Sequence, residues 1–460
     1  MKEWSGRFSK RLSSLFIKYT MSIRIDRRLS LIDVICNIAH CNMLRKIGVL
    51  KKRERYDIVK ILKRIFKEIK RKKLNWMERF EDIHTNIERH VIERNKKLGL
   101  KMRTARSRND LSTTELRIWI KNKTKNIFKN LKLLIRTIIN ISIKSRDIIM
   151  PSFTHFQIAQ PIILSHYWLC YKNMFYRDLI RFRNSYKFAD YLPLGSGAVS
   201  GTSFNIDRKY LARKLKFKNI SNNSIDSVSD RDYVMDFCFS CSMCILHISR
   251  ICEEIIIFTN SLIDFISIDD RYCSGSSMMP QKKNPDVFEV MRSKAGTVIS
   301  GMISLMIIMK GLPLAYNKDY QEDKQICFKV ADNLCKSLRM LNVTIRSLKF
   351  KKKKLMKASE KDFSEATDLA EYLTKKGVPY MKSHEIVSRL VNMFEEKGSF
   401  KKLRDRDIRK VTKNKHVLKF VRKNNIYSII NKKISIGGTS IIQINREIKN
   451  SIKKLKKINI

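Results

Sequence analysis

Apolar residues return every three or four positions over long stretches of this chain, which is the spacing of one helix face. In the stretch from Ser112 to Ile149 the pattern includes Leu116, Trp119 and Ile127, and Pro151 follows as a stop signal. A helix of that length would extend about 57 Å at about 1.5 Å per residue. Similar patterns cover Ile162–Asp190, Asp230–Ile266, Val287–Lys310 and Lys324–Phe350. Long helices in a row, joined by short segments that contain Pro or Gly, predict an elongated all-α bundle.

Composition agrees with a large helical protein. The 460 residues include only 7 Pro and 14 Gly, which leaves long uninterrupted segments for helices. Hydrophobic residues make up 43% of the chain, which excludes general disorder. A chain of this length exceeds one ordinary domain and predicts about two to four.

The sequence predicts neither a membrane span nor export. The longest uncharged run, Ala295 to Met309, is shorter than the roughly 20 residues of a span, and we expect a helix buried on all sides there. Glu3 lies among the first residues and no apolar core follows it, so no signal peptide is expected. The 10 cysteines show no disulfide framework, which favours a reducing, cytoplasmic location.

Cys238, Cys241 and Cys244, followed by His247, are candidates for a metal site. They recur at helical spacing among Phe, Met, Ile and Leu, without the Gly or Pro that shapes a cluster loop. A buried helix that uses Cys as a small apolar residue is therefore the favoured interpretation.

The formal charge of +53 would ordinarily indicate nucleic-acid binding. Lys is spread along the whole chain beside abundant Ile and Asn, residues with A- and T-rich codons, which is typical of base-composition drift in a genome. The densest runs, Lys351–Lys354 and Lys453–Lys457, lack the interleaved aromatic residues of single-strand binders. We expect solvated helix faces and no specific nucleic-acid partner.

Residues 274–286 are the segment most informative about function, with the sequence Ser-Gly-Ser-Ser-Met-Met-Pro-Gln-Lys-Lys-Asn-Pro-Asp. Ser276 follows a flexible glycine, and Lys282 and Asn284 add a cation and an amide between two prolines. A mobile hydroxyl beside fixed donors suits removal of a proton and stabilisation of the resulting anion. Alone, the segment could also be a plain Gly/Ser/Pro loop.

This segment resembles the signature loop of the fumarase/aspartase superfamily, whose members cleave C–N or C–O bonds and release fumarate. Within that superfamily the chain is most similar to the argininosuccinate lyases, almost from end to end. The other blocks that carry the resemblance are Trp4–Phe8, Glu81–Glu88, Thr104–Asp110, Thr154–Pro161, Leu192–Ala198, Val228–Asp232, Gly311–Asp319, Gln321–Lys324, Ala366–Ala370 and Gly437–Ser440.

The resemblance implies a three-domain fold. Residues 1–105 would form an N-terminal helical domain, 106–358 the central long-helix bundle with the signature loop 274–286, and 359–460 a small C-terminal helical domain. The bundles of four subunits would associate into a twenty-helix core of a homotetramer, with active sites shared between subunits.

The resemblance also implies a reaction. Argininosuccinate cleavage removes a weakly acidic proton beside a carboxylate and expels arginine from the adjacent carbon. Ser276 matches the superfamily's base, with Lys282 stabilising its anion and the substrate dianion. His155 suits protonation of the leaving nitrogen, and in the family it pairs with a glutamate that matches Glu289. Which of Ser276 and His155 gives the proton and which takes it stays open.

The residues expected to bind substrate lie in several blocks. Arginine and amide groups at a helix N-terminus favour anions, which suits Arg108 and Asn109 for the fumarate half. The other matches are Ser22, Thr154, Asn284, Tyr316, Gln321 and Lys324, with Asp82, His84 and Arg231 as weaker candidates. An inert structural histidine at position 155, and surface roles for Gln321 and Lys324, are the alternatives. No cofactor or metal is implied, because a base and hydrogen-bond donors suffice.

Four positions depart from the family's usual residues. Ala105 and Leu111 stand where glycine and glutamine are usual, and Asn37 and Ile158 where serine and arginine are usual. Ala105 matters most because a positive φ there would strain its Cβ. None of the four removes a group named above, so we expect activity to be kept with reduced stability.

Two other functions stay open at this point. A sister lyase acting on adenylosuccinate, aspartate or malate shares the chemistry, although Gln321–Lys324 favours the arginine substrate. The second is a non-catalytic structural member of the family, against which the joint presence of Ser276, His155, Lys282 and Asn284 argues.

Overall fold

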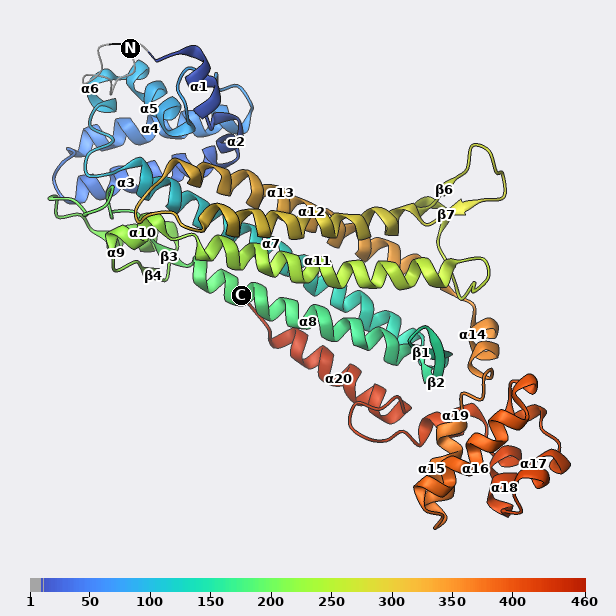
Figure 1. Ribbon diagram of the computed structural model, residues 1–460. Helices are drawn as coiled ribbons and strands as arrows, with labels where there is room; N and C mark the ends of the chain where they lie inside the picture. The colour runs from blue at the N-terminus through green and yellow to red at the C-terminus, as the bar shows by residue number, and fades with distance from the viewer. Residues whose placement is uncertain (1–9, 11) are drawn as a thin grey trace.

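The computed structural model describes residue 10 and residues 12–460 and shows an elongated, largely helical molecule (Figure 1). The block Trp4–Phe8 therefore lies outside the described residues. Five long helices run side by side: α7 (Arg108–Lys144), α8 (Leu164–Ala189), α11 (Asp232–Thr259), α12 (Asp286–Met309) and α13 (Glu322–Thr344). Each corresponds to one of the predicted patterns, and the all-α prediction is confirmed.

The helix boundaries depart from the predicted ones where local signals decide them. α7 begins before Ser112 because Ser107 caps it: Asn109 N donates to Ser107 Oγ at 3.2 Å. The Ser107 amide in turn donates to Asp110 Oδ1 at 3.2 Å, which completes a capping box. At the other end the helix stops at Lys144, and the apolar residues up to Pro151 enter a strand.

The bundle surrounds one large apolar core. Phe175, Phe182 and Phe288 are 0% exposed, and the Trp119 ring lies 4.4 Å from that of Phe328. Full burial of a large apolar side chain contributes about 1.5–3 kcal/mol, so this core holds the long helices together.

Cys238, Cys241 and Cys244 are 0% exposed on α11 and belong to this core, as the apolar interpretation of them predicted. The nearby His247 forms a hydrogen bond from Nδ1 to Asp178 at 2.7 Å. That bond satisfies a polar group on an otherwise apolar helix face.

A second core lies at the start of α7, between the N-terminal helices and short elements from the middle of the chain. The N-terminal helices are α1 (Ser14–Thr20), α2 (Ile23–Asp26), α3 (Ser30–Lys46), α4 (Lys52–Lys70), α5 (Ile83–Arg94) and α6 (Lys96–Gly99). The short elements are β3 (Tyr191–Leu192), α9 (Arg208–Leu215), β4 (Asn219–Ile220) and α10 (Ser224–Ser229), with β3 and β4 parallel.

The opposite end of the bundle carries three short antiparallel pairs. They are β1 (Ile149–Thr154) with β2 (Gln157–Ile163), β5 (Ile266–Ser267) with β8 (Lys349–Phe350), and β6 (Ser274–Gly275) with β7 (Lys283–Asn284). The β6–β7 pair forms the base of the signature loop, and β1–β2 is a hairpin between α7 and α8.

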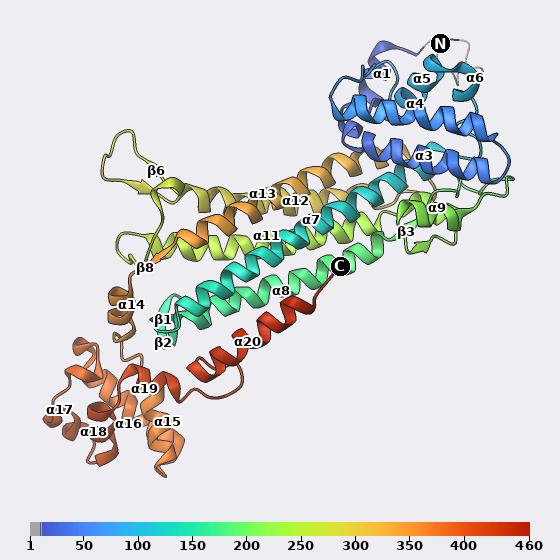
Figure 2. The same cartoon turned by 180° about the vertical axis from the view of Figure 1, so that it is seen from behind.

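The C-terminal part leaves the bundle through α14 (Lys352–Ser359) and forms a third core. Its helices are α15 (Ala366–Lys375), α16 (Tyr380–Met393), α17 (Asp405–Val411), α18 (Lys415–Lys423) and α19 (Ile426–Asn431). The last helix, α20 (Ile441–Lys457), returns to pack on α7 and α8 (Figure 2). Its Ile444, Ile448 and Leu455 belong to the core of the bundle.

One helix differs from its predicted burial. On α12, Ile303, Met306 and Ile307 are 52%, 54% and 67% exposed, so the prediction of a helix buried on all sides is wrong for the single chain. α11 and α13 cover one face of α12 and leave the other as an apolar stripe. Across residue 10 and residues 12–460, no helix has the length and hydropathy needed to cross a membrane.

Candidate active site

The predicted site residues occupy opposite ends of the bundle. Six of them lie where α7 begins and form what we call the anchoring cluster: Ser22, Arg108, Asn109, Tyr316, Gln321 and Lys324. Thr154, His155 and the signature loop lie where α7 ends. Because α7 has 37 residues, about 55 Å of helix separate the two ends.

Arg108 is held at the start of α7 by acidic residues of the N-terminal part. Its Nη1 donates to Asp82 Oδ2 at 2.7 Å and lies 3.7 Å from Glu81 Oε2. Asp82 also caps α5 by accepting from Thr85 N at 2.7 Å. Burial opposes ionisation of Asp82, but His84 and Arg108 outweigh it and lower its pKa. The guanidinium is thus fixed in place and still 42% exposed, as an anion-binding group must be.

Lys324 is a buried cation rather than a surface residue, which excludes one of the alternatives considered for it. It is 4% exposed, and its Nζ donates to Asp323 Oδ1 at 3.0 Å. Burial lowers the pKa of Lys324, but Asp323 and Asp26 outweigh it and raise that pKa overall. Arg231 Nε also donates to Asp323, at 2.5 Å, so one carboxylate orients two cations.

Ser22 and Tyr316 lie beside this cation. Ser22 Oγ donates to Asp26, whose pKa burial raises against the opposing charge of Lys324. Burial likewise raises the pKa of Tyr316, which is also close to Lys324. The side-chain amide of Gln321 is oriented so that its oxygen accepts from Lys318 Nζ at 3.1 Å and its nitrogen donates to the N-terminal part of the chain. The cluster therefore gathers hydroxyl, amide and ammonium groups suited to carboxylates.

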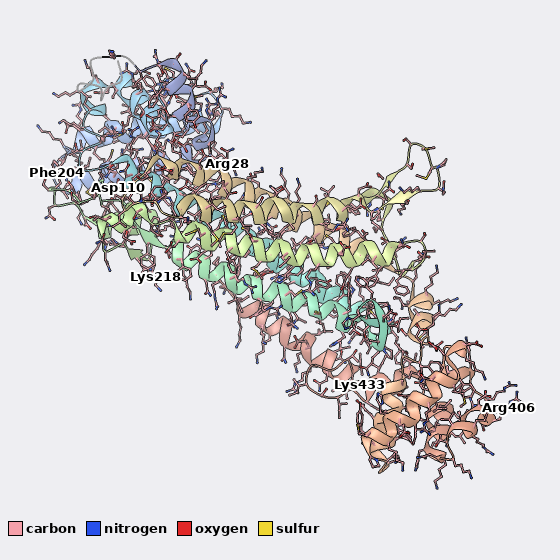
Figure 3. All side chains as sticks on the ribbon, viewed as in Figure 1. Arg28, Asp110, Phe204, Lys218, Arg406 and Lys433 are labelled. Atoms are coloured by element: carbon pink, nitrogen blue, oxygen red, sulfur yellow. The ribbon has the colours of Figure 1, made fainter. Side chains whose placement is uncertain are left out.

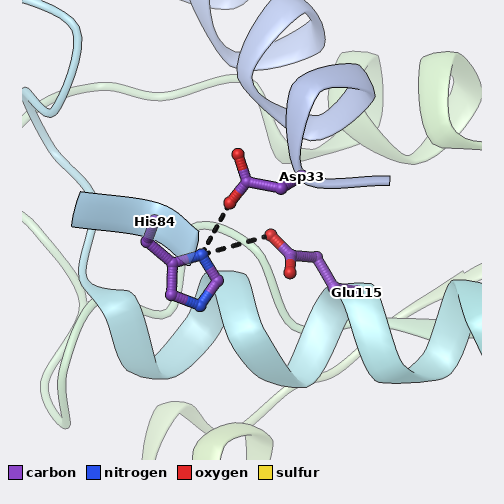
Figure 4. A group of neighbouring side chains, drawn as sticks. All are labelled: Asp33, His84 and Glu115. Carbon is purple, nitrogen blue, oxygen red and sulfur yellow. Dashed lines mark hydrogen bonds and ion pairs between the residues drawn. The ribbon is translucent and has the colours of Figure 1, made fainter. Parts of the chain in front are cut away.

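Asp33, His84 and Glu115 form a buried triad (Figure 4) near Asp82, the partner of Arg108. His84 Nδ1 lies 2.6 Å from Asp33 Oδ2 and 3.6 Å from Glu115 Oε1. Burial opposes protonation of His84, but Asp33 outweighs it and raises the pKa of the imidazole. Burial and the Asp33 charge raise the pKa of Glu115. The three ligand atoms lie within 4.8 Å of one another, and both carboxyl oxygens of Glu115 are buried without a hydrogen-bond partner.

The signature loop presents Ser276 in a setting that favours its anion. Ser276 Oγ accepts from Met278 N at 3.2 Å and from Met279 N at 3.0 Å. Two amide dipoles on one oxygen stabilise negative charge there. Asn284 Nδ2 donates to Ser274 Oγ at 3.3 Å across the β6–β7 pair, and the Lys282 side chain is exposed.

His155 lies at the tip of the β1–β2 hairpin. His155 and Phe156 have φ values of 52° and 60°, the left-handed pair that a tight hairpin turn requires. The side chain of His155 is exposed, and Phe156 is 81% exposed. Glu289, expected to pair with His155, lies in the first turn of α12 beside the signature loop. The start of α12 and the β1–β2 hairpin lie apart in both views (Figures 1 and 2).

The sequence patterns indicated no role for Asp110, which lies in the first turn of α7 (Figure 3). It is 0% exposed, and its Oδ2 accepts from Gly195 N at 2.9 Å and Gly197 N at 3.0 Å. Burial raises the pKa of Asp110 to about 6. The sequence signal for Asp110 was its position three residues after a serine that caps a helix. Its hydrogen bond to Gly195 is a tertiary contact, which this local signal does not predict.

Three of the four departures from the family pattern fall at buried or turn positions, and Ile158 lies partly buried in β2. Ala105 has a φ of 61°, as the usual glycine at this position suggested. Asn37 Nδ2 donates to Asp33 Oδ1 at 2.6 Å and so joins the buried triad. Leu111 is 1% exposed in the second core, and Ile158 pairs with Phe153 in the hairpin.

Comparison with known proteins places these features in context. The chain matches the sequence model of a family described as "Lyase" over residues 6–300, and that of "Argininosuccinate lyase C-terminal" over residues 363–436. It is 39% identical to argininosuccinate lyase of Caldicellulosiruptor bescii over 463 aligned residues, covering 100% of this chain and 99% of that protein. It is 40% identical to argininosuccinate lyase of Pelagibacter ubique, with 97% of each chain covered.

Solved structures agree on the fold. A variant of EDDS lyase with bound fumarate superimposes with a TM-score of 0.84 at 20% identity, covering 94% of this chain and 87% of that one. A class II fumarase from Schistosoma mansoni superimposes with a TM-score of 0.73 at 15% identity, covering 91% and 94%.

Proposed function

The chain belongs to the argininosuccinate lyase family, and from this premise we propose which residues perform its reaction. The protein is a carbon–nitrogen lyase that converts argininosuccinate to arginine and fumarate. Its substrate is therefore a small molecule with carboxylates at one end and a guanidine nitrogen at the bond that breaks.

Ser276 is the base in this proposal. Its oxygen, as the anion, takes the proton from the carbon beside a carboxylate, and the electron pair moves into that carboxylate. The observation that carries this role is the pair of amide donors on Ser276 Oγ, which lower the cost of the anion. Lys282 and Asn284, on the same loop, stabilise the dianion that forms.

His155 is the acid. When the C–N bond breaks, the electron pair of the dianion forms the double bond of fumarate, and the guanidine nitrogen takes a proton from the protonated imidazole, which becomes neutral. A histidine suits this step because it exchanges protons near neutral pH. Thr154 and Glu289 accompany His155 in the assembled site, Thr154 as a substrate contact and Glu289 as its partner.

The anchoring cluster holds the substrate. Arg108 and Asn109 bind the fumarate half with Ser22, and Tyr316, Gln321 and Lys324 bind the arginine half and its carboxylate. The exposed guanidinium of Arg108 and the buried ammonium of Lys324 supply the two fixed positive charges that this requires.

The active sites are shared between subunits of a homotetramer. Ser276, His155 and the anchoring cluster lie apart in one chain, so one chain alone does not complete a site. The exposed apolar stripe of α12 supports an assembly in which the central bundles pack together.

In this arrangement residues 1–105, 106–358 and 359–460 form three domains, and α20 returns to the bundle. The ten free cysteines favour the cytoplasm as its location.

A fumarate assay tests the proposed function. The purified protein is incubated separately with argininosuccinate, adenylosuccinate, aspartate and malate, and release of fumarate is followed spectrophotometrically. We expect rapid turnover of argininosuccinate alone. Faster turnover of any of the other three compounds would contradict argininosuccinate as the substrate.

A further inference from the structure

The pairing of the hairpin that carries His155 is interrupted in its middle. Pro151 lies opposite Pro161, and neither proline has an N–H to donate to the ladder. The register also shifts between Pro151 and Phe153. Ser152 Oγ bridges this gap by donating to Gln160 O at 2.6 Å, but an isolated two-stranded hairpin is at best marginally stable. Its orientation therefore depends on contacts outside the hairpin.

Two such contacts come from the C-terminal part and meet both strands at the base of the hairpin. Ile163 N, at the end of β2, donates to Thr439 Oγ1 at 3.0 Å. Tyr427 OH, on α19, donates to the carbonyl of Asp147, just before β1, at 2.6 Å. Each strand is thus held at its base by a separate hydrogen bond, β2 through the amide of Ile163 and β1 through the carbonyl of Asp147.

Two glycines, Gly437 and Gly438, allow the backbone conformation of the turn that contains Thr439. Gly437 has a φ of 86°, and a Cβ on Gly438 would lie 2.4 Å from the carbonyl oxygen of Lys433, which Figure 3 labels beside this turn. Only glycine accommodates both conditions. Thr439 is 7% exposed, and Ser440 is 0% exposed at the start of α20.

α20 in turn is fixed to the bundle. Lys172 on α8 forms an ion pair with Glu447 of α20, and Lys132 on α7 donates to the Ile458 carbonyl at 2.9 Å. Thr439 therefore connects the hairpin to a helix that the bundle already holds.

We propose that Thr439 and Tyr427 are positioning residues for His155, which act by fixing the base of the β1–β2 hairpin. The inference rests on the proposed role of His155. β2 has 7 residues and extends roughly 20 Å at about 3.3 Å per residue. A rotation of about 3° at the base then moves the tip by about 1 Å, and a misplacement of that size can lower turnover by about 10²-fold.

Substitutions at the two hydroxyls test the inference by steady-state kinetics. Thr439→Val keeps the shape of the side chain and removes the acceptor, and we expect kcat to fall about tenfold with a smaller change in KM. Thr439→Ser retains the hydroxyl and should keep kcat within about twofold of wild type. Tyr427→Phe should lower kcat about threefold.

The matched control is Thr374→Val, in α15 of the same C-terminal part. Its Oγ1 donates to Ala370 O at 2.9 Å and does not reach the hairpin, so kcat should stay unchanged. An equal loss of kcat in Thr374→Val would show a general structural effect and overturn the inference. If Thr439→Val fails to fold, Tyr427→Phe still decides the question, because Tyr427 is 42% exposed and its ring is retained.

Subunit mixing then locates the defect. Under subunit exchange, Thr439→Val mixed with Ser276→Ala should regain activity, because some sites combine an intact loop with an intact hairpin. Thr439→Val mixed with His155→Asn should regain none, since every hairpin is defective. Recovery in the second mixture would overturn the inference.

His155→Asn alone separates this inference from the proposed function. If His155→Asn is inactive and Thr439→Val is fully active, only the positioning role fails. If His155→Asn keeps wild-type turnover, the proposed role of His155 fails and the positioning role with it.

Discussion

His40 Nε2 lies 2.9 Å from the carbonyl oxygen of Thr104, in the turn that leads into α7. His40 is 1% exposed, and burial, with the Arg106 charge, lowers its pKa to about 3. The imidazole is therefore neutral, and its Nε2–H donates to Thr104. The next residue, Ala105, has the left-handed φ of 61°. A buried neutral histidine and a strained alanine thus shape the turn that precedes the Ser107 cap of α7.

Ala105→Gly should raise the free energy of unfolding by about 0.5–1 kcal/mol. A residue with a Cβ in the left-handed region costs about 1–2 kcal/mol, and glycine removes this cost. The greater backbone freedom of glycine in the unfolded chain offsets about 0.5–1 kcal/mol of that gain. Urea denaturation measures the difference. Ala358→Gly, inside α14, is the control and should lower stability, and a loss of stability in Ala105→Gly would contradict the strain.

Stability should fall as the pH drops below 6.5, in part because of His40. Its pKa is about 3 in the folded chain against an ordinary 6.5, so the unfolded chain binds more protons between these values. The contribution of His40 is therefore full above pH 6.5 and is lost on acidification, by about 1.4 kcal/mol per pH unit. His40→Gln removes the titration and keeps a donor for Thr104.

Thermal unfolding between about pH 4.5 and 7 measures this prediction, because most of this range lies between the folded and unfolded pKa values of His40. The slope against pH should be shallower in His40→Gln than in wild type. His384→Gln, at an exposed position of α16, is the control. An unchanged slope in His40→Gln would show that His40 is not held neutral.

Ser276→Ala should lower kcat by about 10²–10⁴-fold and leave the fold intact, because the residue lies in a loop and is the proposed base. The adjacent exposed Ser277→Ala is a matched control with nearly wild-type kcat. Circular dichroism establishes folding and the fumarate assay the rate. A folded Ser276→Ala protein with wild-type turnover would remove Ser276 from the mechanism.

Mixing two inactive variants should restore part of the activity if sites are shared. Ser276→Ala and His155→Asn chains contribute their defects to different sites after subunit exchange, so some sites in a mixed tetramer are intact. Mass spectrometry of the intact assemblies confirms exchange. Confirmed exchange without any return of fumarate production would mean that each chain contains a complete site.

The long helices were predictable because their apolar spacing is a local property of the sequence. α8 (Leu164–Ala189) and α12 (Asp286–Met309) lie within a few residues of the predicted patterns. The start of α7 was missed because a polar cap at Ser107, rather than an apolar residue, sets it. The exposed face of α12 was missed because hydropathy alone does not distinguish a helix buried on all sides from one that leaves an apolar face exposed.

The sequence also indicated which kinds of side chain the candidate site offers, namely hydroxyl, amide, imidazole and cationic groups. The family resemblance is confirmed. The roles of Ser276 and His155 stay predictions. Their separation from Arg108 was not predictable from local spacing, because it depends on the direction of each long helix. The same holds for Asp110, whose amide partners lie 85 and 87 residues away in sequence.

α7 connects the anchoring cluster to the His155 hairpin as one continuous helix of 37 residues. Each added or deleted residue would change its length by about 1.5 Å and rotate one end against the other by about 100°. A single insertion would thus turn the hairpin to a different side of the bundle while leaving every catalytic side chain present. The number of residues between Arg108 and Lys144 is therefore as much a condition of activity as the identity of the groups at either end.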